Sequence, residues 1–408
     1  MKKLLIIGSY YTEISIVKCA KELGYYTIVV DYFTDPARTP AKAIADEAWD
    51  MSWTDIDALA LRCQEEGVDG VLAGYSENRV ESMILLCQRL GLPCGLTMEQ
   101  FDVTRDKAKF KHCCHRYGLN VVRDYQYNEV ERFPVIVKPV DRGGSIGITV
   151  AYNREEFEQA YAYAMSMSLS KNIVTEDFIA DGTKVDVYYY VKNKQITLLG
   201  MSDTIMCKGK TASEILQKAW VFPSKHVMEY MEETDGKVRQ LLDGLNIDNQ
   251  YLTLSAFYKD GNFLFFEAGF RLSGEMSFNY YRQVSGCDYL EEMIRYAMGD
   301  ADIALLPQCD CTQLSSVILN YFIKDGVIRE VKNKDIITSL PDVCDFLMYV
   351  NPGEKICNST GVLKKSAMCT IFSDDIMGSV RRVNQLYGVY DENGKDMIYE
   401  RVQDVELE

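Results

Sequence analysis

The chain has 408 residues, a formal net charge of −16 and a hydrophobic fraction of 47%. The acidic balance argues against a nucleic-acid partner, which requires a basic face, and no apolar run is long enough to span a membrane. The 13 cysteines are odd in number and irregularly spaced, which favours reduced thiols over a disulfide framework. We therefore expect a cytoplasmic protein of about two to four domains.

Predicted strands and helices alternate over the first hundred residues. The apolar and amphipathic runs that predict them lie at residues 4–7, 13–23, 27–31, 55–66, 70–73 and 77–90. This alternation is typical of a parallel sheet with helices on both faces. The turn after the first strand has one glycine, Gly8, where a dinucleotide site needs three. NAD binding is therefore disfavoured, although Asp31 ends the second strand as a ribose-binding acid would.

After a predicted helix over residues 97–118, the chain shows a strand, a glycine-containing loop and a second strand. Residues 133–139 form an apolar run that includes Lys138, residues 140–147 contain three glycines, and residues 148–151 predict the second strand. Walker and dinucleotide loops run from a strand into a helix, so neither type fits. Glycines allow backbone amides to approach a phosphate, and Lys138 supplies a point charge. Considered alone, the loop fits a surface hairpin with a solvated lysine equally well.

The rest of the chain mixes helices and strands. A helix is predicted over residues 154–167, with Asn153 as its N-cap. Residues 251–271 predict two strands joined by a turn at 259–262. The last hundred residues carry several short strand signals and turn pairs, which predict a small α+β unit.

The order of these features resembles the ATP-grasp superfamily of carboxylate–amine ligases, including its carbamoyl-phosphate synthase, biotin-carboxylase and purine-synthesis branches. The resemblance rests on Lys107 after an aspartate, on Lys138 before the glycine loop, and on the segments 174–182 and 264–271. Each motif is weak by itself, but their order and spacing are specific, and together they cover the whole chain.

The resemblance implies a fold of the α/β and α+β classes in three parts. Residues 1–100 would form a parallel α/β pre-ATP-grasp domain. Residues 101–305 would form a two-lobed ATP-grasp domain, with a lid at about 120–185. Residues 306–408 would form a small α+β cap.

The resemblance also implies that ATP and Mg²⁺ bind between the lobes. Lys107 and Lys138 would contact the α- and β-phosphates, and Glu267 would be the magnesium ligand. Arg271 would steady the transferring phosphoryl group, with Lys138 as the second catalytic residue. The implied nucleotide-binding residues are Lys107, Lys138, Arg142, Gly143, Gly144, Ser145, Gly147, Glu176, Asp177, Phe178, Ile179 and Asp186.

Three positions depart from the pattern of most relatives. Gly269 stands where they have an asparagine ligand, Ser255 where they have an acid, and Lys184 where they have a ribose-binding glutamate. Asp186 lies on the same strand face as Lys184 and could take the ribose contact. Magnesium often needs only one or two carboxylates together with phosphates and water, so Glu267 alone could hold it.

The implied activity is the ATP-dependent joining of a small-molecule carboxylate and an amine, through an acyl phosphate. Glu77 and Glu275 are the candidate substrate contacts, although an acid at the start of a helix explains Glu77 equally well. A homodimer is also expected, with no nucleic acid and no membrane as partners. Two alternatives stay open: a nucleotide-binding homologue without turnover, and a bicarbonate-activating enzyme that forms carboxyphosphate.

Overall fold

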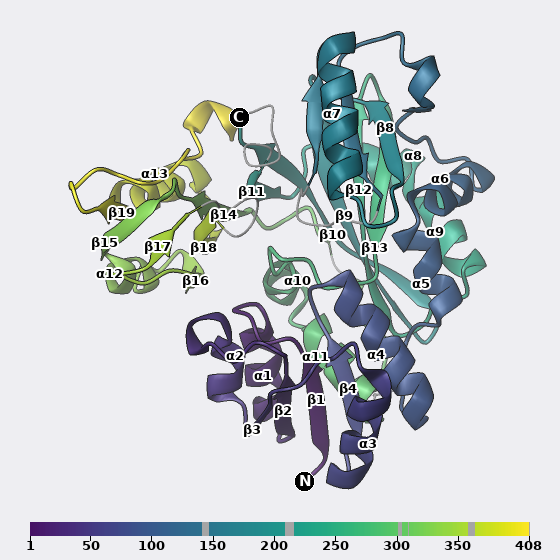
Figure 1. Cartoon of the computed structure of the whole chain (residues 1–408), viewed down its shortest axis with the longest axis vertical. Helices are drawn as coiled ribbons and strands as arrows, with labels where there is room; N and C mark the ends of the chain where they lie inside the picture. The colour runs from purple at the N-terminus through teal and green to yellow at the C-terminus, as the bar shows by residue number, and fades with distance from the viewer. Residues whose placement is uncertain (141–146, 209–215, 301–303, 309, 358–363, 408) are drawn as a thin grey trace.

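The computed structural model describes residues 1–140, 147–208, 216–300, 304–308, 310–357 and 364–407. Four sheets organise these residues, and the N-terminal and C-terminal parts lie on the same side of the long central strands (Figure 1). No helix in these ranges combines the length and the apolar character needed to cross a bilayer.

The N-terminal sheet is parallel, with the strand order β3-β2-β1-β4. Its elements are β1 (Lys3–Ile7), α1 (Glu13–Glu22), β2 (Tyr26–Val30), a 3₁₀ turn (Pro36–Arg38), α2 (Pro40–Ile44), β3 (Glu47–Trp49), α3 (Ile56–Glu66), β4 (Gly70–Ala73) and α4 (Glu77–Leu90). The predicted alternation is confirmed. Residues 4–7 are fully buried, because helices cover a parallel sheet on both faces. The 3₁₀ turn, α2 and β3 were not predicted, since elements of three to five residues are too short to show a period.

The segment predicted as one helix over 97–118 is two helices, α5 (Met98–Arg105) and α6 (Lys107–Arg116). Asp106 separates them because its backbone is extended and its carboxylate accepts hydrogen bonds from the backbone amides of Ala108 and Lys109, at 2.9 and 3.1 Å. An aspartate that caps the second helix therefore ends the first one. Lys107 becomes the first residue of α6.

A separate four-stranded sheet with the order β5-β8-β6-β7 lies under α7 (Arg154–Met167). Its elements are β5 (Asp124–Tyr125), a 3₁₀ turn (Tyr127–Glu129), β6 (Val135–Pro139), β7 (Thr149–Ala151) and β8 (Ile173–Asp177). The two strands predicted on either side of the glycine segment are confirmed, since β6 and β7 pair antiparallel, while residues 141–146 between them lie outside the described residues. Asn153 caps α7 as predicted, accepting from the amide of Glu156 at 2.9 Å. The sheet lies within the residues expected to form the lid, whose limits stay a prediction.

The largest sheet has eight strands in the order β13-β12-β9-β10-β11-β14-β18-β16. These strands are β9 (Thr183–Lys192), β10 (Gln195–Met206), β11 (Gln217–Phe222), β12 (Gln250–Lys259), β13 (Asn262–Gly269), β14 (Ser316–Phe322), β16 (Val343–Met348) and β18 (Lys365–Phe372). The predicted hairpin over 251–271 is β12 and β13. Because β14 pairs with β11, the C-terminal part continues the sheet of the central part.

Further helices and a small fourth sheet complete the chain from residue 227 onward. They are α8 (Val227–Glu233), α9 (Asp235–Gly244), α10 (Phe278–Ser285), α11 (Tyr289–Ala297), β15 (Gly326–Lys332), α12 (Lys334–Thr338), β17 (Lys355–Ile356), α13 (Ile376–Leu386), β19 (Gly388–Asp391) and a 3₁₀ turn (Asp404–Glu406). The small sheet has the order β17-β15-β19.

Candidate active site

A cleft of about 1670 Å³ opens where the N-terminal sheet, the lid sheet and the eight-stranded sheet meet. Every predicted site residue that the structure describes lines it, except Gly147. The lining residues of the predicted set are Glu77, Lys107, Lys138, Glu176, Asp177, Phe178, Ile179, Asp186, Glu267, Arg271 and Glu275. The predicted residues Arg142, Gly143, Gly144 and Ser145 lie outside the described residues.

Gly147 lies where the loop enters β7, and its backbone explains the glycine. Its φ is +78°, and a Cβ atom there would approach the ring of Pro139 to 2.7 Å and Cβ of Met167 to 3.0 Å. Only glycine fits both the conformation and the space. Its structural role is therefore to shape the base of the loop.

Lys138 is held in place by a buried carboxylate. Its side chain forms an ion pair with one oxygen of Glu176, and the other oxygen lies 2.8 Å from Nζ of Lys111. Lys111 also donates to the carbonyl of Val122 and to Asp124, both at 2.8 Å. Burial would raise the pKa of Glu176, but Lys138 and Lys111 hold it below its ordinary value. Both oxygens of the Glu176 carboxylate are thus paired with lysines, and the carboxylate positions the ammonium of Lys138.

The end of β8 supplies an apolar edge to the cleft. Asp177 accepts a hydrogen bond from the hydroxyl of Tyr125 at 2.6 Å, which fixes its side chain to the lid sheet. Phe178 and Ile179 follow and line the cleft. Such a segment can offer an apolar wall and backbone groups to a flat heterocyclic base.

Four charged residues from three distant parts of the chain line the same cleft as Lys138. Glu77 begins α4, Lys107 begins α6, Glu267 lies on β13, and Arg271 follows that strand. Nε of Arg271 is 4.0 Å from the carboxylate of Glu77. Burial raises the pKa of Glu77; the charges of Arg271 and Lys107 oppose this shift, while Glu267 adds to it. Glu77 therefore lies beside Arg271, the predicted catalytic residue. A residue that binds substrate would have to lie there, as predicted for Glu77.

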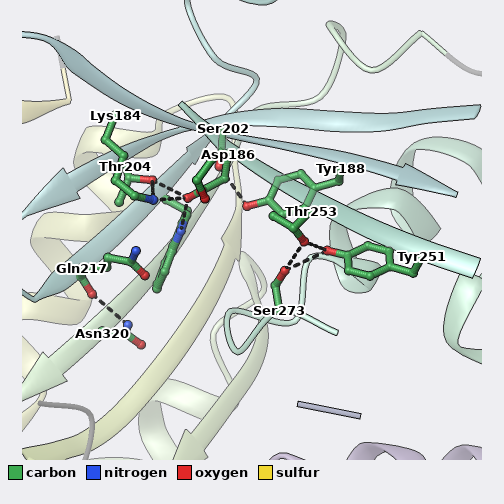
Figure 2. Close-up of polar contacts among 12 residues, drawn as sticks. Lys184, Asp186, Tyr188, Ser202, Thr204, Gln217, Tyr251, Thr253, Ser273 and Asn320 are labelled. Carbon is green, nitrogen blue, oxygen red and sulfur yellow. Dashed lines mark hydrogen bonds and ion pairs between the residues drawn. The ribbon is translucent and has the colours of Figure 1, made fainter. Parts of the chain in front are cut away.

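The carboxylate of Asp186 is fully occupied by neighbouring donors. Lys184 and Thr204 donate to one oxygen at 2.6 and 2.8 Å (Figure 2), Trp220 donates to the same oxygen at 3.2 Å, and Ser255 donates to the other at 2.5 Å. Burial would raise the pKa of Asp186, but Lys184 and the hydroxyl donors hold it below its ordinary value. A ribose hydroxyl would have to share this carboxylate, so the ribose contact stays a prediction.

The residues present fit a magnesium ion through a single protein carboxylate. Glu267 lines the cleft, and no ion pair to it occurs in the described part of the chain. Its strand neighbour Ser255, in register with both Glu267 and Asp186, directs its hydroxyl to Asp186. Among the residues that the structure describes, no group of three or more His, Cys, Asp or Glu side chains could hold a metal. One carboxylate, with phosphates and water, is sufficient for Mg²⁺.

Sequence reasoning missed Lys111 and Lys365. Lys111 lies four residues after Lys107, one turn along α6, and this helical spacing was the available signal. Lys365 lies on β18, far from every motif in the sequence, and reaches the cleft because the C-terminal strands continue the central sheet.

Comparison with known proteins identifies the architecture. The family model "D-ala D-ala ligase C-terminus" matches residues 90–210. The D-alanine–D-alanine ligase of Fusobacterium nucleatum is 37% identical over 86 residues, which are 21% of this chain and 28% of that protein. The first curated relatives are matched over 23%, 28% and 48% of their own lengths.

Solved structures match over nearly the whole chain. The L-amino acid ligase of Bacillus licheniformis superposes with a TM-score of 0.78 and 17% identity, over 96% of this chain and 99% of that one. The biotin carboxylase domain of the Hydrogenobacter thermophilus 2-oxoglutarate carboxylase, solved with MgADP and bicarbonate, has a TM-score of 0.78 and 17% identity, over 98% and 91%. The chain has the ATP-grasp fold of these proteins, and its residues 90–210 match the D-ala D-ala ligase C-terminal family.

Proposed function

We propose that the protein is an ATP-dependent ligase that joins a carboxylate and an amine into an amide, with release of ADP and phosphate. The observation that carries the proposal is the convergence of Lys107, Lys138, Glu267 and Arg271 in one cleft. Lys107 and Arg271 are far apart in the sequence. Each of the four residues has the charge that its proposed role requires. The L-amino acid ligase that shares the fold supports the reaction class.

In the first step, a carboxylate oxygen of the acid attacks the γ-phosphorus of ATP. The bond from that phosphorus to the bridging oxygen breaks, and ADP leaves with the electron pair. Lys107 and Lys138 neutralise charge on the polyphosphate, and Arg271 binds the equatorial oxygens of the transferring group. Glu267 would hold Mg²⁺, which would supply further neutralisation of the phosphate charge.

In the second step, the amine nitrogen attacks the acyl carbon of the acyl phosphate. The bond from that carbon to the phosphate oxygen breaks, phosphate leaves, and the nitrogen loses a proton. The protein contributes mainly by positioning both reactants and by excluding water from the acyl phosphate. The apolar wall of Phe178 and Ile179 would hold the base of ATP in the same cleft.

The test is ADP release with MgATP and a panel of small acids and amines, singly and in pairs. We expect turnover that needs one acid and one amine, and a loss of at least a hundredfold in Glu267→Ala. Glu65→Ala, on the exposed face of α3, is the matched control and should retain full activity. Turnover that survives unchanged in Glu267→Ala would contradict the role of Glu267.

A second candidate function is nucleotide binding without ligation. The observation that favours it is that Ser255 and Gly269, which flank Glu267 in the β12–β13 hairpin, supply neither a carboxylate nor an amide ligand. It predicts that ATP binds equally well with Mg²⁺ and with EDTA, and that no acid and amine pair releases ADP. Calorimetric titration of ATP under both conditions separates this function from the ligase.

A further inference from the structure

A lysine of the C-terminal part lies in the cleft apart from the predicted site. Lys365 begins β18, is half-buried, and places its ammonium 5.4 Å from the ring centroid of Tyr349. No ion pair to Lys365 occurs in the described part of the chain, whereas its neighbour Lys364 pairs with Asp325 at 3.2 Å. Burial lowers the pKa of Lys365 to about 8, and the nearby Glu275 opposes that shift. Lys365 is thus a cation in the cleft without a fixed counter-ion among the described residues.

Three buried polar atoms line the same cleft without hydrogen-bond partners among the described residues. They are Oε1 of Glu275, Oδ1 of Asn320 and the hydroxyl of Tyr349. Their residues are only 5%, 3% and 6% exposed. Buried polar atoms in native proteins are nearly always paired, so unpaired ones that line a cleft indicate groups that a ligand completes.

The side chain of Tyr349 is held rigidly between the N-terminal and C-terminal parts. Its ring stacks on Tyr10 with the centroids 6.2 Å apart, and it meets Tyr11 edge-on at 5.1 Å. Both tyrosines follow β1 and line the cleft. The polar atoms therefore stand on a preorganised floor, which reduces the entropy lost when a small ligand binds.

We propose that Lys365, Glu275, Asn320 and Tyr349 form the subsite for the amine substrate, and that this amine also carries an oxyanionic group. Lys365 binds the oxyanion, which is a carboxylate or a phosphate. The acceptor oxygens of Glu275 and Asn320 receive the N–H donors of the amino group. This inference rests on the proposed ligase function, since it assigns one of the two substrates.

The chain geometry connects this subsite to the site of transfer. Glu275 lies four residues after Arg271, a distance of at most about 14 Å along an extended chain. An amino group at Glu275 would therefore lie in the same region of the cleft as an acyl phosphate at Arg271. Lys365 and Glu267 lie on β18 and β13, which five other strands separate in the sheet. The oxyanion at Lys365 is thus distinct from the carboxylate that receives the phosphoryl group.

The test is calorimetric binding to the full chain, without ATP. The probes are the twenty L-amino acids and O-phosphoethanolamine, each compared with the counterpart that lacks the anionic group, the amino-acid amide or ethanolamine, which is called here the neutral counterpart. We expect at least one anionic amine to bind and its neutral counterpart to bind about ten- to a hundredfold more weakly, the usual effect of losing a charge-assisted hydrogen bond. Selective binding of an amino acid would identify the oxyanion at Lys365 as a carboxylate, and selective binding of phosphoethanolamine would identify it as a phosphate.

Substitutions test whether Lys365 causes this difference in affinity. Lys365→Met should weaken the binding of the anionic probe by the same factor and leave the affinity for the neutral probe unchanged. Lys365→Arg should retain most of the affinity for the anionic probe. Lys364→Met is the matched control and should change neither affinity. The proposal is wrong if no anionic amine binds the wild type, or if acids and amides bind equally, a comparison that needs no variant to fold.

These outcomes are separable from those of the ligase test. Selective binding of an anionic amine without any ADP release supports the subsite and contradicts the ligase. ADP release that depends on a neutral amine, and that Lys365→Met leaves unchanged, supports the ligase and contradicts the subsite.

Discussion

Glu176 shows how one buried carboxylate can position two lysines. It is 1% exposed, and its oxygens face Lys138 on β6 and Lys111 on α6. Lysines are rarely buried without a partner, because the cost of removing the ammonium from water is large. The carboxylate offsets this cost and leaves Lys138 at the wall of the cleft, where a phosphate can take its free hydrogen-bond donors.

Replacing Glu176 by Gln should lower the free energy of unfolding by about 3–5 kcal/mol, since one partner of a buried ion pair is lost and two ammonium groups remain. The folded-state pKa of Glu176 is depressed, so its stabilisation is complete above the ordinary glutamate pKa of about 4.3 and is lost as the pH falls through the lower folded value. The difference between wild type and variant should therefore shrink on acidification. Urea unfolding between pH 7 and pH 3 measures this, with Glu65→Gln as control. A difference that stays constant with pH would refute the assignment.

The break between α5 and α6 places a helix start at the cleft. Lys107, in the first turn of α6, is unfavourable for the helix dipole, whose positive end lies there. The same arrangement concentrates positive potential beside Arg271 and Lys138, which suits a polyphosphate. Lys107 therefore lowers the stability of α6 and at the same time supplies a positive charge that the proposed function needs.

Asp106→Ala should remove the cap of α6 and lower the free energy of unfolding by about 1 kcal/mol. Because Lys107 loses its fixed position when this turn frays, the affinity for ATP should fall as well. Asp106→Asn keeps a capping oxygen and should preserve both quantities. Urea unfolding and ATP calorimetry on the two variants test this, and an equal effect of both substitutions would show that the cap is not the cause.

At the scale of the molecule, one sheet joins the central and C-terminal parts. β11 pairs with β10 on one side and with β14 on the other. Lys218 on β11 is 1% exposed and pairs with Glu400 and, at 2.8 Å, with Glu406, near the end of the chain. The wall that carries Lys365 is therefore fixed relative to the strands that carry Asp186.

A shared sheet should unfold cooperatively. We expect the amides of β14 and β18 to lose protection at the same urea concentration as those of β10 and β11. Lys218→Met should lower that concentration for both sets together, because it leaves two partly exposed glutamates facing an apolar group. Hydrogen exchange followed by mass spectrometry measures each strand. Earlier exchange of β14 and β18 would show that the C-terminal part is an independent unit.

Local sequence determined the elements that depend on nearest neighbours. Most strands and helices of the N-terminal part, the strands β6 and β7, the Asn153 cap and the β12–β13 hairpin were predicted. Their signals, which are periodicity, caps and turn residues, act over fewer than twenty residues. The order of the charged motifs was equally readable, and it indicated the superfamily.

Tertiary structure alone decided which distant groups meet. The pairing of Lys111 with Glu176, the saturation of Asp186 by Ser255 and its neighbours, and the arrival of Lys365 in the cleft have no local signal. Each depends on helices or strands far apart in the sequence lying side by side, and such contacts follow from the packing of whole sheets and helices. The sequence by itself thus indicated the fold and the charged groups, while long-range packing determined which of those groups remain available to a ligand.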